Sequence, residues 1–159
     1  VVQEFNNSVK IILNDGHCKI GLESTVIDLI SKPKILRPGL IEPKTISKVL
    51  NIKITVNNNS LIVRAPGMLK RHYSPGIPMK LNQKKAKDNE AFIVFGKKYK
   101  KKKNIFNLSY KSSLNEAAKN LYKTLRIIKN KKYKVICVCS IPQIGIGLAI
   151  NDRLNRAAK

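Results

Sequence analysis

The chain has 159 residues, a formal net charge of +23 and 43% hydrophobic residues. This length suits one ordinary domain or two small ones, and the apolar content is enough for a packed core. No apolar run reaches the ~18 residues that a membrane-spanning helix requires, and the start "VVQEFNNSVK" lacks the basic and apolar regions of a signal peptide. We therefore expect a cytoplasmic protein with no membrane partner.

The positive charge has two interpretations, and the sequence leaves both open. A net charge of +23 favours a nucleic-acid partner. However, lysine greatly outnumbers arginine, and isoleucine and asparagine are abundant. Codons rich in A and T encode lysine, isoleucine and asparagine, so a drift in genome composition would produce much of the charge without selection for RNA binding.

The three cysteines do not form the even, spaced set that is typical of a disulfide framework. Cys137 and Cys139 lie in the apolar run "VICVC", where a strand would point both side chains to the same face. We expect buried, reduced thiols. One cysteine pair offers too few ligands for a metal site.

Before residue 64 the pattern mainly indicates strands. The stretch "PKTISKVL" predicts one short helix, with Pro43 tolerated in its first turn. Apolar and β-branched runs bounded by turn residues predict short strands at 9–13, 21–30, 32–39, 51–56 and 60–65.

The segment "RAPGMLKRHYSPGIP", residues 64–78, separates this part from the next. A simple tether needs only flexibility and solubility, whereas the three prolines stiffen this one. Arg71, His72 and Tyr73 are adjacent at its centre. We predict a linker that folds back over a ligand, with these three side chains as lid residues.

After residue 78, strands alternate with helices, which favours a parallel, layered α/β domain. The clearest helix spans 112–130, where Ser113 and Glu116 form a capping box. Its apolar residues recur on one face at helical spacing. The remaining predictions are a strand at 91–95, a basic loop at 96–104, a strand at 133–139 and a helix at 149–158.

Three motifs carry groups that suit an anion, and each also has a structural interpretation. The hydroxyls of Ser24 and Thr25 in "GLESTVIDL" either bind a carboxylate or phosphate or satisfy a strand end. Arg37 in "ILRPG" either binds an anion with its fork of donors or lies on the surface. Gly145 and Gly147 in "IPQIGIGLAIN" form either a phosphate-binding turn or an ordinary turn and packing contact.

Taken together, "GLESTVIDL", "ILRPG", "APGMLKRHYSPGIP" and "PQIGIGLAINDRLNRAA" resemble, in this order, two-domain threonylcarbamoyl-AMP synthases. The resemblance covers most of the chain. It implies the end of a YrdC-type twisted α/β sheet domain at 1–63, a linker and lid at 64–78, and a small Rossmann-like α/β domain at 79–159.

The resemblance also implies a reaction in which ATP, L-threonine and bicarbonate give threonylcarbamoyl-adenylate and pyrophosphate. The product serves threonylcarbamoyl modification of a tRNA adenosine, which downstream transferase proteins complete. By resemblance, Ser24 and Thr25 contact threonine, Arg37 contacts ATP, and Mg²⁺ accompanies the nucleotide. The early Lys-Arg motif and Ser-Ala-Asn segment of the family do not occur in the sequence. We therefore expect a piece of a longer reading frame that is inactive alone.

Three other interpretations remain open. The first is a basic module of YrdC type that binds tRNA or double-stranded RNA without catalysis. The second is a carbamoyl-transferring maturation factor, and the third is the product of a split or decayed gene. The linker and the "DRL-x-RAA" motif argue against the maturation factor, because they are features of the two-domain synthases. Salt-sensitive tRNA binding that survives loss of Arg37 would favour the RNA-binding module.

Overall fold

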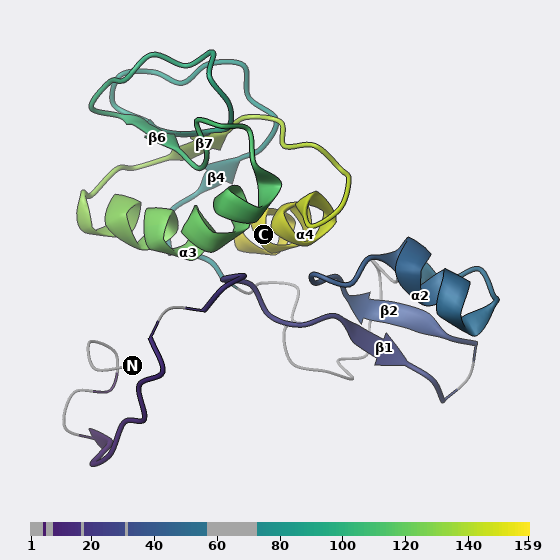
Figure 1. Cartoon of the computed structure of the whole chain (residues 1–159). Helices are drawn as coiled ribbons and strands as arrows, with labels where there is room; N and C mark the ends of the chain where they lie inside the picture. Colours follow the sequence, from purple (N-terminus) through teal and green to yellow (C-terminus); the bar gives the residue numbers. More distant parts are fainter. Residues whose placement is uncertain (1–4, 6–7, 17, 31, 57–72) are drawn as a thin grey trace.

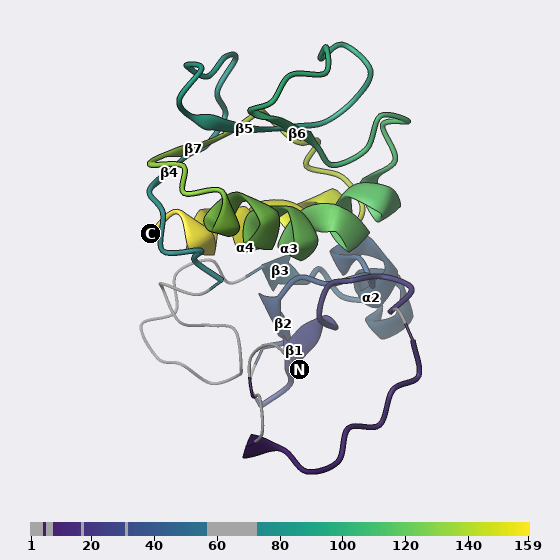
Figure 2. The same ribbon diagram turned by 90° about the vertical axis from the view of Figure 1, so that its left-hand side faces the viewer.

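The computed structural model describes residues 5, 8–16, 18–30, 32–56 and 73–159. These residues form a mixed α/β fold with two sheets (Figure 1). Two long helices, α3 (Leu114–Asn130) and α4 (Gly147–Ala157), lie between the two sheets (Figure 2). The predicted α/β class is confirmed. The predicted division of the chain into a first domain at 1–63, a linker at 64–78 and a second domain at 79–159 stays a prediction.

The smaller sheet has three strands in the order β1-β2-β3, at Val26–Asp28, Lys34–Arg37 and Thr55–Val56. β1 and β2 are antiparallel, whereas β2 and β3 are parallel and are joined through helix α2 (Pro43–Leu50). The backbone N–H groups of the first helical turn have no acceptor within the helix, so proline, which lacks an N–H, is favoured there. This explains why α2 begins at Pro43. Ile35, Ile46 and Ile54 form a small core beneath the helix.

The larger sheet is parallel, with strand order β4-β7-β5-β6. Its strands are β4 (Met79–Lys80), β5 (Ala91–Val94), β6 (Ile105–Asn107) and β7 (Ile136–Val138). The two central strands, β5 and β7, are entirely buried, because α3 and α4 cover one face and loops cover the other. Cys137 and Cys139 lie on the loop-covered face, where burial raises the pKa of both thiols. Their predicted burial is therefore confirmed.

Helix α3 follows the predicted pattern closely. The Ser113 hydroxyl accepts a hydrogen bond from the backbone N–H of Glu116 at 3.3 Å. The Glu116 carboxylate does not complete the capping box; it accepts a bond from the Ser109 hydroxyl at 2.6 Å. The apolar face packs into the main core, with these buried residues: Ala117, Ala118, Leu121, Leu125 and Ile128.

Several strand predictions need correction. Residues 9–13 form no strand, and the side chain of Leu13 is 94% exposed, since no described segment pairs with this run. The strand predicted at 51–56 shrinks to β3. The two short strands β4 and β6 were not predicted, and the strand predicted at 60–65 lies outside the described residues. Of the described helices, none is both long and apolar enough to cross a bilayer.

Candidate functional site

The predicted threonine-binding residues lie where the small sheet begins. Ser24 and Thr25 directly precede β1, and the turn after β2 packs against them. At Gly39, a Cβ atom would overlap the backbone nitrogen of Thr25 and lie 2.6 Å from the carbonyl carbon of Ser24. The Thr25 hydroxyl donates a hydrogen bond to the carbonyl oxygen of Ile41 at 2.9 Å. Thr25 therefore helps to hold the two segments together, whereas the Ser24 side chain is exposed.

Arg37, the predicted ATP-binding residue, is brought next to Ser24. Its side chain lies at the end of β2, and the residue is only 8% exposed. The Nε atom donates a hydrogen bond to the carbonyl oxygen of Ser24 at 3.1 Å. The interpretation of Arg37 as a simple surface residue is therefore wrong. The guanidinium of Arg37 fixes the backbone of the segment that carries the candidate threonine-binding hydroxyl.

Glu23, one residue before Ser24, forms a cluster with residues of the two long helices. Its Oε2 atom accepts a hydrogen bond from Nε of Arg153 at 3.0 Å, and its two carboxylate oxygens lie 3.2 and 3.0 Å from the Tyr122 hydroxyl. Arg153 is 1% exposed and also binds Asp152 at 2.7 Å. This cluster joins the start of the small sheet to α3 and α4.

Tyr73, a predicted lid residue, completes the cluster. Its ring stacks on that of Tyr122 with centroids 5.5 Å apart, and the Arg153 guanidinium lies 5.4 Å from its ring centroid. The backbone φ of Tyr73 is 63°, in the left-handed region that non-glycine residues rarely adopt. Arg71 and His72 lie outside the described residues. The structure thus places Tyr73 of the linker beside Tyr122 and Arg153.

In this cluster, Glu23 and Arg153 each stabilise the charged form of the other. Burial raises the pKa of Glu23, but hydrogen bonds from its own backbone N–H, Arg153 and Tyr122, together with the Arg153 charge, outweigh burial and bring it below the ordinary 4.5. Burial lowers the pKa of Arg153, but Glu23, Tyr73 and Asp152 outweigh it, and the net shift is upward. The pKa of Tyr122 is raised, mainly by burial and then by Glu23. At neutral pH the cluster therefore holds a carboxylate, a guanidinium and neutral phenols.

We expect the stabilising contribution of Glu23 to be lost in acid. Because the folded pKa is below the unfolded one, this contribution is fully present above the unfolded pKa and disappears as the pH falls through the folded value. The melting temperature of Glu23→Gln should lie a few degrees below that of the unmodified chain at pH 7. The gap should narrow below about pH 4.5. A gap that persists at pH 3 would contradict this prediction, and Asp15→Asn, at an exposed acid, is the control.

Residue spacing did not reveal Glu23, Tyr122 or Arg153 as a cluster. Glu23 and Arg153 are 130 positions apart, and Tyr122 also belongs to the apolar face of α3 that packs on the main core. One signal was available in the composition. The chain has 32 basic residues but only 9 acidic ones, so each carboxylate beside a candidate site is a candidate partner for a buried cation.

Gly145, in the turn before α4, and Gly147, the first residue of α4, have structural roles. Gly145 adopts a φ of +55°, which favours glycine, and the backbone N–H of Gly147 donates to the carbonyl of Ile144 at 2.9 Å. A Cβ at Gly147 would overlap the carbonyl oxygen of Pro142. These contacts support the interpretation of a turn and a packing contact. Among the described residues, no group of three or more His, Cys, Asp or Glu side chains could hold a metal ion.

A family model described as "Threonylcarbamoyl-AMP synthase, C-terminal domain" matches residues 41–159, three quarters of the chain. The chain belongs to this family. A second family model, described as "Telomere recombination", matches residues 1–39. The boundary between the two matches falls just after Gly39. The Glu23–Arg153 contact therefore connects the segment matched by one family model to the segment matched by the other.

Curated relatives in the threonylcarbamoyl-AMP synthase family align with almost the whole chain. The Pyrococcus abyssi synthase is 32% identical over 99% of the chain, and the Bacillus subtilis synthase is 27% identical over 99%. These alignments cover 52% and 51% of the two relatives, respectively. The chain thus spans about half the length of the curated relatives that it matches.

Solved structures of the same family share the fold. Pyrococcus abyssi Sua5 complexed with L-threonine superposes with a TM-score of 0.82 at 28% identity, covering 99% of this chain and 52% of that one. A variant of the same Sua5, with a histidine and the following tyrosine replaced by alanine, gives a TM-score of 0.79 at 26% identity. It covers 99% of this chain and 51% of that one.

Proposed function

We propose that this chain acts within a threonylcarbamoyl-AMP synthase that converts ATP, L-threonine and bicarbonate to threonylcarbamoyl-adenylate and pyrophosphate. The observation that carries the proposal is the match to enzymes of this name across 99% of the chain. Because the chain spans about half of those relatives, the complete site requires residues beyond these 159. The isolated chain is therefore proposed to be inactive.

Ser24 is the proposed contact for the threonine substrate. Ser24 is an exposed residue whose carbonyl is held by Arg37, so its side chain extends from a fixed backbone. A Sua5 structure holds L-threonine, which supports a threonine site in this fold. Thr25 has a supporting role, since its hydroxyl donates to Ile41.

Arg37 is the proposed contact for ATP. In the proposed reaction, the threonine amine and bicarbonate form a carbamate, with loss of water. A carbamate oxygen then attacks the α-phosphorus, the bond from the α-phosphorus to the bridging oxygen of the β-phosphate breaks, and pyrophosphate leaves. A guanidinium beside the threonine segment would neutralise phosphate charge during this step. Mg²⁺ is proposed as a companion of the ATP phosphates, whose charge it would help to neutralise.

Tyr73 and its neighbours are proposed to form the lid. The sequence contains one adjacent His-Tyr pair, His72 and Tyr73. An adjacent histidine and tyrosine were replaced together in the solved Sua5 variant. In this chain Tyr73 contacts the cluster that contains Glu23, next to Ser24, which supports closure of the linker over the threonine segment.

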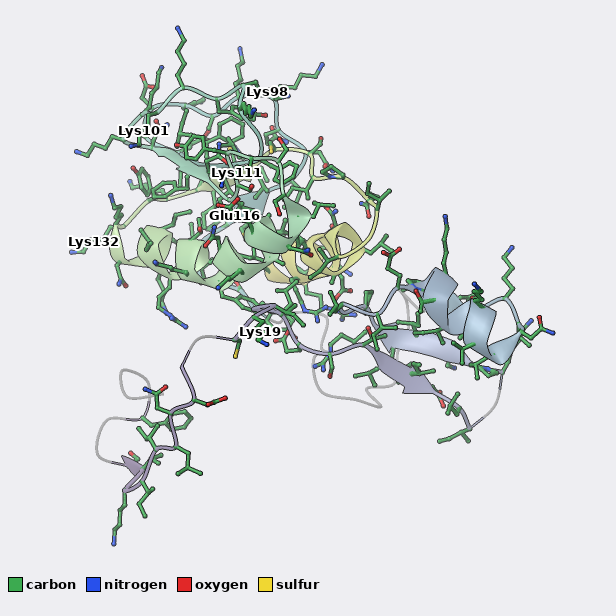
Figure 3. All side chains as sticks on the ribbon, viewed as in Figure 1. Lys19, Lys98, Lys101, Lys111, Glu116 and Lys132 are labelled. Atoms are coloured by element: carbon green, nitrogen blue, oxygen red, sulfur yellow. The ribbon has the colours of Figure 1, made fainter. Side chains whose placement is uncertain are left out.

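The wider partners are proposals of the same kind. We propose a cytoplasmic enzyme whose product passes to tRNA threonylcarbamoyl transferase proteins. An RNA-binding role is the second candidate, supported by basic side chains around the larger sheet. Lys98 and Lys101 project from the loop after β5, and Lys132 projects from the loop after α3 (Figure 3). Retention of tRNA in a salt-dependent manner by the isolated chain would support this role.

The test is threonine-dependent pyrophosphate release by the full-length protein that contains this chain. With ATP, bicarbonate and Mg²⁺ present, we expect release that requires L-threonine, and a product with the mass of threonylcarbamoyl-adenylate. The isolated chain should give neither. Release without threonine, or no adenylate product from the folded full-length protein, would overturn the proposal. Activity of the isolated chain would refute its proposed inactivity.

A further inference from the structure

We infer that Arg153 is a positioning residue for the threonine substrate, acting through Glu23 across the contact between α4 and the small sheet. This inference rests on the proposed function. It assigns to the second half of the chain a role in threonine affinity, exerted through the ion pair between Arg153 and Glu23.

Residues 20–23 pack against the long helices. The side chains of Ile20 and Leu22 pack against the main core that α3 and α4 share with the larger sheet. Gly21 has a φ of +76°, and a Cβ there would lie 2.7 Å from the Cα of Lys119. The segment therefore lies directly on α3. Its contacts with the helices determine the position of Ser24.

The last anchor of this segment is Glu23. Its carboxylate is 34% exposed but binds a guanidinium that is 1% exposed. A guanidinium buried to this extent needs carboxylate partners, because an uncompensated buried charge is strongly destabilising. Arg153 has two, Glu23 and Asp152, while its second terminal nitrogen has no hydrogen-bond partner among the described residues. Asp152 is its neighbour in α4, so Glu23 is the partner that lies outside the helix.

If the backbone of Glu23 moves, the position of Ser24 must change as well. The carbonyl oxygen of Ser24 accepts the bond from Arg37, and Gly39 packs against the peptide between Ser24 and Thr25 with no free space. Movement of the Glu23 backbone would therefore disturb the Arg37 bond and the direction of the Ser24 hydroxyl. The hydrogen bonds of Arg153 reach Glu23 and Asp152, whereas the Ser24 carbonyl is bound by Arg37, so we infer that Arg153 acts on Ser24 through Glu23.

The test is a double-mutant cycle in the full-length protein, read as the KM values for threonine and ATP. Glu23→Gln removes the charge but keeps the shape, and we expect it to raise the threonine KM about tenfold. Arg153→Gln should have a similar effect, and the double variant should be no worse than either single one. Since the change concerns threonine positioning before chemistry, kcat should stay within about twofold, and the ATP KM should rise less than the threonine KM because the Arg37 side chain is unchanged. Arg126→Gln, which removes an exposed charge from α3, should change nothing.

Hydrogen exchange of residues 22–27 with and without L-threonine distinguishes the possible failures. We expect threonine to protect these amides in the unmodified protein and much less in Glu23→Gln. An unchanged threonine KM in folded Glu23→Gln, or additive effects in the double variant, would overturn the inference while leaving the proposed function intact. If the unmodified protein makes no adenylate, the proposed function fails. The inference then stands only if threonine still protects these amides in a Glu23-dependent manner.

If Arg153→Gln does not fold, Arg153→Lys keeps the charge in a shorter and less directional side chain. We expect it to restore part of the threonine affinity. A fully normal threonine KM in both Arg153→Lys and Glu23→Gln would overturn the inference, because each change removes a bond on which it depends.

Discussion

Replacing Arg37 by alanine is expected to lower kcat/KM for ATP at least about a hundredfold in the full-length protein. Two losses combine in this variant. The proposed contact with phosphate disappears, and the carbonyl of Ser24 loses the donor at 3.1 Å. The measurement is ATP-dependent adenylate formation under saturating threonine.

The variant Arg37→Lys separates the two losses. Lysine keeps the positive charge but has no Nε donor in a fixed planar group. If the backbone bond matters, Arg37→Lys should remain far below normal activity, with a raised threonine KM. Activity of Arg37→Ala within about threefold of normal would contradict both the proposed ATP contact and the structural role.

Replacing Gly39 by alanine is expected to abolish threonine binding and to destabilise the small sheet by roughly 1–3 kcal/mol or more. The added Cβ would overlap the Thr25 nitrogen and lie 2.8 Å from the carbonyl oxygen of Glu23. All of the crowded atoms belong to the backbone, so no side-chain rotation relieves the overlap. Calorimetric titration of the full-length protein with L-threonine, together with urea unfolding, checks the prediction.

Gly16→Ala is the matched control, because a Cβ at Gly16 meets nothing within 4 Å. Gly16 has a φ of +81°, so this control carries some backbone strain but no overlap. It should retain threonine binding. If Gly39→Ala bound threonine with unchanged affinity, the turn after β2 would have no role in shaping the Ser24–Thr25 segment.

The helices were predictable because their signals are local. Pro43 marks the start of α2, and the Ser113 cap with its periodic apolar residues marks α3. Residues 9–13 carry a strand-like pattern, but a strand also needs a partner, and none of the described segments supplies one. Strands β4 and β6 have two and three residues, too few for periodicity to appear. Their existence depends on pairing with β7 and β5.

The candidate site was predictable only in part. The motifs and their resemblance identified Ser24, Arg37 and Tyr73 as separate candidates, and the structure brings the first two into direct contact. The connection through Glu23, Tyr122 and Arg153 joins residues 99 and 130 positions apart. No local pattern encodes such a contact, because it depends on how α3 and α4 pack against the segment before β1.

The packing of residues 20–22 on the long helices has a consequence for evolution and for gene fusion. The two family models divide the chain near residue 40, whereas Ile20 and Leu22 belong to the same core as α3 and α4. The boundary between the two family models thus differs from the boundary of the packed core. A segment starting at residue 41 that was transferred to a new protein would expose an apolar strip and leave the Arg153 charge without Glu23. Successful recombination within this fold would therefore have to carry the short "KIGLE" stretch along with the C-terminal half.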